Sequence, residues 1–202
     1  IDAAAGIDFS SDLCTEAAKF MVDMAASPNF VNDVDGTGVA GMLDGSIGAM
    51  FSGDWDEPNL APLGENLGCA VLPTFTLANG ETYQMKSFAS NKAVGVNPNA
   101  KFPKAAMQLA QFLTTAESLA LRHELSGYIP AANGVEVDSA TVTVVNAQMA
   151  TATIAQPVLA QMSNLWDPVK NFGLNILNGT ITKDNVGEMI AATMELLNSN
   201  GL

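Results

Sequence analysis

Two tryptophans, each next to aspartate, are the residues whose types and spacing best suit ligand chemistry. Trp55 lies in the run GDWDEP at residues 53–58, and Trp166 precedes Asp167 and Pro168. A flat aromatic ring stacks on the apolar face of a ligand, while nearby carboxylates, amides or ammonium groups fix its orientation. The candidate ligand-binding residues near the two rings are Trp55, Asp54, Asp56 and Glu57, and Trp166, Gln161 and Lys170.

Each candidate also has an ordinary structural explanation. Tryptophan is highly buried on average, so either ring could belong to a core. Asp54 and Glu57 have the D-x-x-E spacing of a capping box at a helix start. Lys170 lies one turn beyond Trp166 on an expected helix, where lysine is usually solvated. The sequence favours stacking for the tryptophans, capping for Asp54 and Glu57, and a solvated position for Lys170.

Catalysis finds little support in the sequence, so we expect a protein that is not an enzyme. The single histidine, His123, sits between Arg122 and Glu124 in an expected helix and is predicted to be solvated. The sequence has no G-x-S-x-G elbow and no His/Cys cluster with metal-ligand spacing, so no catalytic residue, metal or cofactor is predicted. A carbohydrate-active hydrolase with an acid/base pair of carboxylates remains an alternative.

Composition excludes several other classes. The chain has 202 residues, 48% of them hydrophobic and 14% charged, which indicates a globular protein with a core. Its 21 acidic and 8 basic residues give a net charge of −13, so no nucleic acid or membrane surface is expected as a partner. The chain begins at Ile1 and looks like the interior of a longer precursor whose signal segment is absent.

The elements that must position these residues alternate between helical and extended patterns, which predicts an α/β fold. Ser10 or Ser11, Asp167 and Asp184 are the expected helix N-caps, and Gly127 is an expected helix end. Cys14 and Cys69 could be buried thiols or a disulfide, and we favour free thiols. Expected helices cover residues 11–26, 39–43, 103–113, 116–125, 138–151, 167–177 and 184–198, and expected strands cover 46–52, 69–72, 81–88 and 92–97.

Four segments, taken in order, resemble one family: the maltose/maltodextrin-binding-protein-like extracellular solute-binding proteins of ABC importers. They are LDGSIGAMFSGDW (43–55), AVLPTF (70–75), AAMQLAQFLTTAESLALRHELSGYIPA (105–131) and QMSNLW (161–166) with the helices that follow it. The resemblance implies a periplasmic-binding-protein-like two-lobe fold of type II, represented by an incomplete later portion. It assigns residues 1–70 to the C-terminal lobe, 74–130 to the N-terminal lobe after a hinge crossing, and 131–202 to a return into the C-terminal lobe.

The same resemblance implies what the protein does. A sugar or oligosaccharide would be captured in the interlobe cleft by aromatic stacking and hydrogen bonding, and Tyr128, near a lobe crossing, joins the candidate site. The expected partners are the sugar and the membrane permease subunits of an ABC transporter. The expected location is extracellular, periplasmic or cell-surface lipid-anchored. A non-sugar solute such as a polyamine is the other alternative. Because residues 74–130 would lack strands to pair with, an edge-paired or swapped dimer is also expected.

Overall fold

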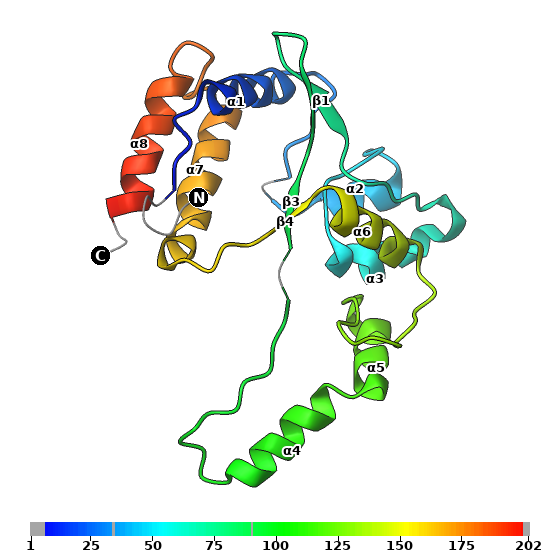
Figure 1. Ribbon diagram of the computed structural model, residues 1–202. Coiled ribbons are helices and arrows are strands. Elements are labelled where there is room, and N and C mark those ends of the chain that lie inside the picture. Colours follow the sequence, from blue (N-terminus) through cyan, green and yellow to red (C-terminus); the bar gives the residue numbers. More distant parts are fainter. Residues whose placement is uncertain (1–6, 34, 90, 200–202) are drawn as a thin grey trace. The chain divides into compact units, whose positions relative to one another are not determined.

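The computed structural model describes residues 7–33, 35–89 and 91–199, and the chain forms two compact units (Figure 1). Unit 1 comprises Ile1–Asn32, Thr74–Gln84 and Gln156–Leu202, and unit 2 comprises Asp33–Pro73 and Met85–Ala155. These boundaries differ from those of the three segments expected from the sequence. The assignment of those segments to lobes stays a prediction.

Unit 1 is built on three helices, α1 (Asp12–Ala25), α7 (Trp166–Leu177) and α8 (Val186–Ser199), with the 3-10 helix η3 (Ala160–Asn164) before α7. The expected cap of the first helix is confirmed, because the Ser11 hydroxyl accepts a hydrogen bond from the Cys14 N–H at 3.2 Å. The three helices enclose one hydrophobic cluster, and a second lies beside η3. The clusters consist of Ala18, Ile176, Ile181, Val186 and Ile190, and of Ile7, Met162, Leu165 and Leu197.

A short antiparallel hairpin completes unit 1. Its strands are β1 (Thr74–Thr76) and β2 (Thr82–Gln84), with Phe75 opposite Tyr83. The Phe75 ring lies 5.1 Å, centroid to centroid, from Phe20 on α1, so an aromatic contact holds the hairpin against the helix.

Unit 2 contains the elements around the Trp55 run. Strands β3 and β4 pair in parallel, Ser87 opposite Thr153. The elements are α2 (Gly38–Asp44), η1 (Asp54–Asp56), α3 (Glu57–Leu60), η2 (Ala61–Asn66), β3 (Ser87–Ala89), α4 (Pro103–Leu113), α5 (Ala116–Ser126), α6 (Ala140–Thr151) and β4 (Thr153–Ala155).

The interior of unit 2 is much thinner than that of unit 1. Its buried large side chains are Leu60, Val142 and the polar Gln148, which are scattered over α3 and α6. Within the described part of the chain, both hydrophobic clusters belong to unit 1. Among the described residues, unit 2 therefore has no buried cluster like the two of unit 1.

Three of the expected strands are wrong. Residues 46–52, 69–72 and 92–97 are extended or irregular and join no ladder in the described structure. Their side chains alternate or are apolar as in strands, but a strand also needs a neighbour to satisfy its main chain. The expected strand 81–88 is split, because Thr82–Gln84 pairs with β1 and Ser87–Ala89 begins β3.

The expected helices are found, with corrections at two of their starts. Leu165 already has helical angles (φ −67°, ψ −43°), so α7 begins at Trp166 and Asp167 lies inside its first turn instead of capping it. The last helix begins at Val186, two residues after the expected cap Asp184. There the Asn185 side chain accepts from the Thr182 N–H at 2.8 Å.

Cys14 and Cys69 are both free, as favoured from the sequence. The expectation for His123 is wrong. Its side chain is half-buried, and its Nδ1 is buried without a hydrogen-bond partner in the described structure. Helix α5 has little amphipathic pattern, so the sequence did not indicate which side of it is covered.

Candidate ligand-binding site

Trp55 is presented on a tight turn in unit 2. The turn runs from η1 directly into α3, and Pro58 stands in the first turn of α3, where a missing N–H costs nothing. The indole is 58% exposed. Its ring lies so close to Gly53 that a Cβ there would be 2.2 Å from Cζ3. The ring is therefore accessible but rests on its own backbone, which limits its rotation.

The three carboxylates of this turn accept hydrogen bonds from the protein. Asp54 Oδ2 accepts from the Ile129 N–H at 3.4 Å, and Glu57 Oε1 accepts from the Ser139 hydroxyl at 2.5 Å. Asp56 accepts from the Ser52 hydroxyl and from the Asn59 amide. These contacts tie the turn to the end of α5 and the start of α6.

The capping box expected from Asp54 and Glu57 is not formed. Gly53 is the N-cap of η1 and Asp56 that of α3, and neither makes a side-chain capping bond. Asp54 and Glu57 instead bind residues 75 and 82 positions away. Sequence spacing could not reveal Ile129 or Ser139 as partners, because no local pattern connects them to the turn.

The end of α5 packs directly on the Trp55 turn. Gly127 is buried, has φ +72°, and closes α5 by donating its N–H to the His123 carbonyl at 2.8 Å. A Cβ at this position would lie 2.6 Å from the Asp54 carbonyl oxygen and 2.9 Å from Pro58 Cδ. Only glycine allows so close an approach at this backbone angle.

Tyr128 follows Gly127 and so belongs to the same surface region. Its half-buried ring has Lys92 Nζ at 5.3 Å and Arg122 Cζ at 5.0 Å from its centroid. Both distances suit cation–π contacts. The structure thus brings Asp54, Trp55, Asp56, Glu57 and Tyr128 together within unit 2, and it adds two cations that the sequence did not indicate.

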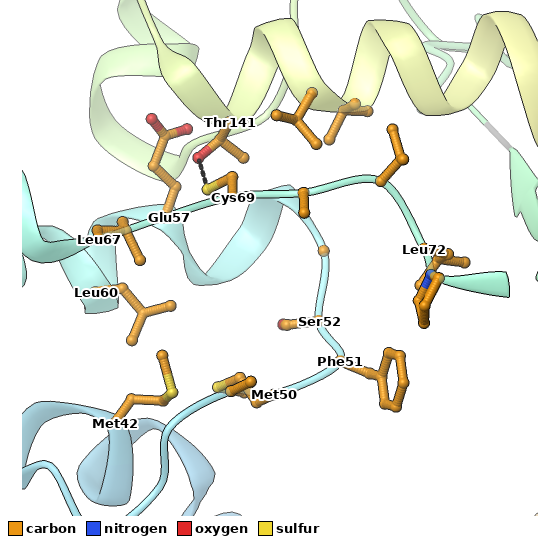
Figure 2. A pocket seen from close by; sticks show the side chains of 18 of the residues that line it. Met42, Met50, Phe51, Ser52, Glu57, Leu60, Leu67, Cys69, Leu72 and Thr141 are labelled. Carbon is orange, nitrogen blue, oxygen red and sulfur yellow. Dashed lines mark hydrogen bonds between the residues drawn. The ribbon is translucent and has the colours of Figure 1, made fainter.

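A mostly apolar pocket of about 440 Å³ adjoins the turn. Two extended segments, 48–53 and 67–73, line it together with α6, and Figure 2 shows Met42 and Met50 opposite Cys69 and Thr141. Cys69 Sγ and Thr141 Oγ1 are 3.5 Å apart. Glu57 also lines the pocket, and its Oε2 is buried with no hydrogen-bond partner in the described structure.

The remaining candidates belong to unit 1. Trp166 starts α7 with 54% of its surface exposed, and Lys170 follows one turn later, also exposed. Gln161 lies in η3, but its side chain is outside the described part of the structure. Exposure of both tryptophan rings agrees with stacking. A concavity shared by Trp55 and Trp166 stays a prediction.

Residues 7–33, 35–89 and 91–199 contain no group of three or more His, Cys, Asp or Glu side chains that could hold a metal ion. Over the same residues, no helix combines the length and apolar character needed to cross a bilayer.

Comparison with proteins of known sequence finds maltooligosaccharide ABC transporter solute-binding lipoproteins from two strains of Streptococcus pneumoniae. One is 26% identical over 182 residues, which is 87% of this chain and 40% of the relative. The other is 26% identical over 181 residues, with 86% and 40% covered. The chain thus spans about two fifths of the length of these relatives.

Solved structures with a similar backbone include two maltodextrin-binding proteins. The ligand-free maltodextrin-binding protein MalE1 of L. casei aligns with a TM-score of 0.72 and 22% identity, over 94% of this chain and 52% of that one. The maltose-maltodextrin binding protein of Alicyclobacillus acidocaldarius gives a TM-score of 0.66, 20% identity and the same coverage. These likenesses confirm the expected type II binding-protein fold, of which this chain represents a part.

The sequence profile of the bacterial extracellular solute-binding proteins matches residues 2–166, which is most of the chain. This match confirms the family expected from the four sequence segments. It also confirms that the chain is not an enzyme, because the family consists of binding proteins, and the alternative of a hydrolase is set aside. The chain belongs to the bacterial extracellular solute-binding protein family.

Proposed function

We propose that this chain is part of the extracellular substrate-binding component of an ABC importer and captures a sugar or oligosaccharide. The observation that carries the proposal is the Trp55 turn. An indole ring is held exposed on a turn whose carboxylates are tied to two other elements of unit 2. A large exposed ring on a well-anchored turn suits ligand stacking better than core packing.

The physical basis is the shape of a pyranose. Its C–H faces are apolar and flat, so an accessible indole can cover one face, while the hydroxyl groups around its rim need polar partners. Because Trp55 is fixed against Gly53, it loses little side-chain freedom on binding. The relatives that match this chain are described as binding maltooligosaccharides, which favours an α-glucan as the first ligand to test.

The other candidate residues have supporting parts in this proposal. Trp166 would also stack on the sugar, with Lys170 and Gln161 as polar partners, and the sugar would lie in an interlobe cleft. Tyr128 would act at the edge of the Trp55 surface. The bound form would be presented to the membrane permease subunits of the importer, outside the cell, with a lipid anchor as one means of attachment.

Isothermal titration with maltodextrins, galacto-oligosaccharides and xylo-oligosaccharides tests the proposal. Trp55→Ala should weaken binding by about 1–3 kcal/mol, or roughly 5- to 150-fold, as expected for a lost aromatic anchor. Trp55→Phe should retain part of the affinity. Phe102→Ala, which removes an exposed ring outside the candidate site, is the matched control and should change nothing.

Two results would contradict the proposal. The first is an unchanged isotherm for both Trp55→Ala and Trp166→Ala. The second is the absence of heat with every sugar together with binding of a polyamine, which would assign the chain to a non-sugar solute.

A further inference from the structure

Four asparagines in the sequence are followed directly by glycine: Asn79, Asn133, Asn178 and Asn200. The last of these pairs lies outside the described residues. An Asn-Gly pair is chemically labile, because glycine has no Cβ to shield its main-chain nitrogen from the neighbouring asparagine side chain. Such a pair can modify itself without an enzyme, and its hydrogen bonds decide how readily it does so.

Exposure and backbone shape do not distinguish the three described pairs. All three asparagines are exposed, and the glycines that follow them have left-handed backbone angles, with φ +85° at Gly80, +80° at Gly134 and +77° at Gly179. Beyond the adjacent residues, no atom lies within 4 Å of the Cβ position of any of these glycines. A difference between the pairs therefore has to come from hydrogen bonds.

The pair at Asn79 is held at both of its reacting groups. The Gly80 N–H donates to the Leu77 carbonyl at 2.9 Å. Asn79 Oδ1 accepts from the Glu81 N–H at 3.0 Å, the turn that an asparagine side chain makes with its own main chain, and Nδ2 donates to Glu81 Oε2 at 3.1 Å. Attack of the glycine nitrogen on the side chain requires these bonds to break.

The pair at Asn178 is held in the same way. The Gly179 N–H donates to the Ile176 carbonyl at 3.1 Å. Asn178 Oδ1 accepts from the Thr180 N–H at 2.9 Å, and Nδ2 donates to Asn175 Oδ1 at 3.4 Å. These partners are close in sequence, so the protection is local to the turn.

The pair at Asn133 has no such protection. In the described structure, neither the Asn133 side chain nor the Gly134 N–H makes a hydrogen bond. The hydrogen bond across this turn, from the Val135 N–H to the Ala132 carbonyl, is long at 3.5 Å. Both reacting groups can therefore approach each other without losing a partner.

We propose that Asn133-Gly134 is a site of spontaneous deamidation, and that its isoaspartate product loosens the loop that anchors the Trp55 turn. The Gly134 nitrogen loses its proton and attacks Asn133 Cγ, the bond from Cγ to Nδ2 breaks, and ammonia leaves. Water then opens the resulting succinimide. Cleavage of the bond from the ring nitrogen to Cγ gives aspartate, and cleavage of its bond to the main-chain carbonyl carbon gives isoaspartate. Water is the only co-reactant, and nothing is oxidised or reduced.

The position of the pair gives the modification its consequence. Asn133 lies in sequence between Ile129 and Ser139, which donate the hydrogen bonds that tie the carboxylates of the Trp55 turn to the rest of unit 2. Isoaspartate lengthens the main chain between these two donors by one carbon atom. It also adds a negative charge to a loop that already contains two acidic residues. Both changes disfavour the geometry in which the two donors reach the turn.

Peptide mapping by mass spectrometry tests the site itself. The folded chain is kept in mildly alkaline buffer, and the exchange of each side-chain amide for a carboxyl is followed with time. Asn133 should react at least about tenfold faster than Asn79 and Asn178, as expected when two ordinary hydrogen bonds have to break first at the protected pairs. In urea that unfolds the chain, the three rates should become similar. Equal rates in the folded chain, or a difference that persists in urea, would overturn the assignment.

Amide hydrogen exchange tests the consequence. In aged protein, peptides that cover residues 53–60 should exchange faster as the isoaspartate content of the loop rises, because opening of the turn costs less free energy. The control Asn133→Gln keeps an amide but has a longer side chain that cyclises much more slowly, so ageing should leave its exchange unchanged. If exchange stays constant while isoaspartate accumulates, or rises equally in Asn133→Gln, the product does not act on the Trp55 turn. Neither test uses a sugar, so both outcomes are independent of the proposed function.

Discussion

Replacing Gly127 by alanine should loosen the turn that carries Trp55. Gly127 has φ +72°, and a Cβ there would meet the Asp54 carbonyl oxygen at 2.6 Å and Pro58 Cδ at 2.9 Å. Neither atom is the far end of a flexible side chain, so relief requires the backbone of the turn or of the α5 end to shift. The substitution therefore combines backbone strain with overpacking.

The two contributions can be estimated separately. A residue other than glycine in the left-handed region costs about 1–2 kcal/mol, and overpacking at a tight contact costs about 1–3 kcal/mol. The sum, about 2–5 kcal/mol, is a large fraction of the about 5–15 kcal/mol by which folded domains are stable. Gly134→Ala is the matched control, because Gly134 has φ +80° but nothing within 4 Å of the Cβ position.

Urea unfolding in a Trp166→Phe background isolates the effect, since Trp55 is then the sole tryptophan and reports on unit 2. Gly127→Ala should lose about 1–3 kcal/mol more than Gly134→Ala, and it should also weaken sugar binding. If the two variants lose the same free energy of unfolding, the close contact between Gly127 and Asp54 contributes nothing, and our account of how Trp55 is positioned is wrong.

Two further predictions concern hydrogen bonds away from this contact. Buried Gln148 accepts a hydrogen bond from the Leu72 N–H at 2.9 Å and donates one to the Ala152 carbonyl at 2.6 Å. Gln148→Leu should therefore lower the free energy of unfolding, measured by urea denaturation, by about 2–4 kcal/mol. The control Gln111→Leu, at an exposed position, should change the free energy of unfolding little. Tyr83 donates to Glu81, which raises the pKa of the Tyr83 phenol and lowers that of the Glu81 carboxyl. The hydrogen bond of Tyr83 should therefore stabilise the fold below pH 10, and this stabilisation should be lost as the pH rises through the raised pKa of the phenol. The difference between the ultraviolet titrations of the wild type and of Tyr83→Phe gives the titration of Tyr83. If Glu81→Gln left that titration unchanged, the hydrogen bond would not be the cause of the raised pKa.

The helices could be predicted because their signals are local. Ser11 and Gly127 act within a turn of the helix ends they determine, and apolar spacing marks the rest. The strands could not, because a ladder depends on a neighbour elsewhere in the chain. Residues 46–52 have the alternation of a strand but join no ladder in the described structure, whereas Ser87–Ala89 finds Thr153–Ala155 across 66 positions.

The candidate site also has features that the sequence predicts and features that only the structure shows. The run 53–58 was recognisable from residue types alone, and the structure shows the Trp55 ring exposed as expected. The D-x-x-E spacing is compatible with a capping box and equally with two separate hydrogen bonds to distant residues. Only the structure could show that Asp54 accepts from Ile129 and Glu57 from Ser139. These contacts depend on how α5 and α6 return to the turn, which no local pattern encodes.

The hydrogen bonds of Asp54, Asp56 and Glu57 also determine which polar atoms near Trp55 are left to bind a ligand. Asp56 accepts a hydrogen bond on each carboxylate oxygen, and the second oxygen of Glu57 is buried in the lining of the pocket. Asp54 accepts from the Ile129 N–H through Oδ2, which leaves Oδ1 as the acceptor that we propose for a ligand hydroxyl. The Trp55 ring and a single hydrogen-bond acceptor would give affinity but little discrimination between sugars, because stacking depends only on the apolar face of the sugar. Under the proposed function, selection of one sugar therefore has to come from polar groups beyond this turn.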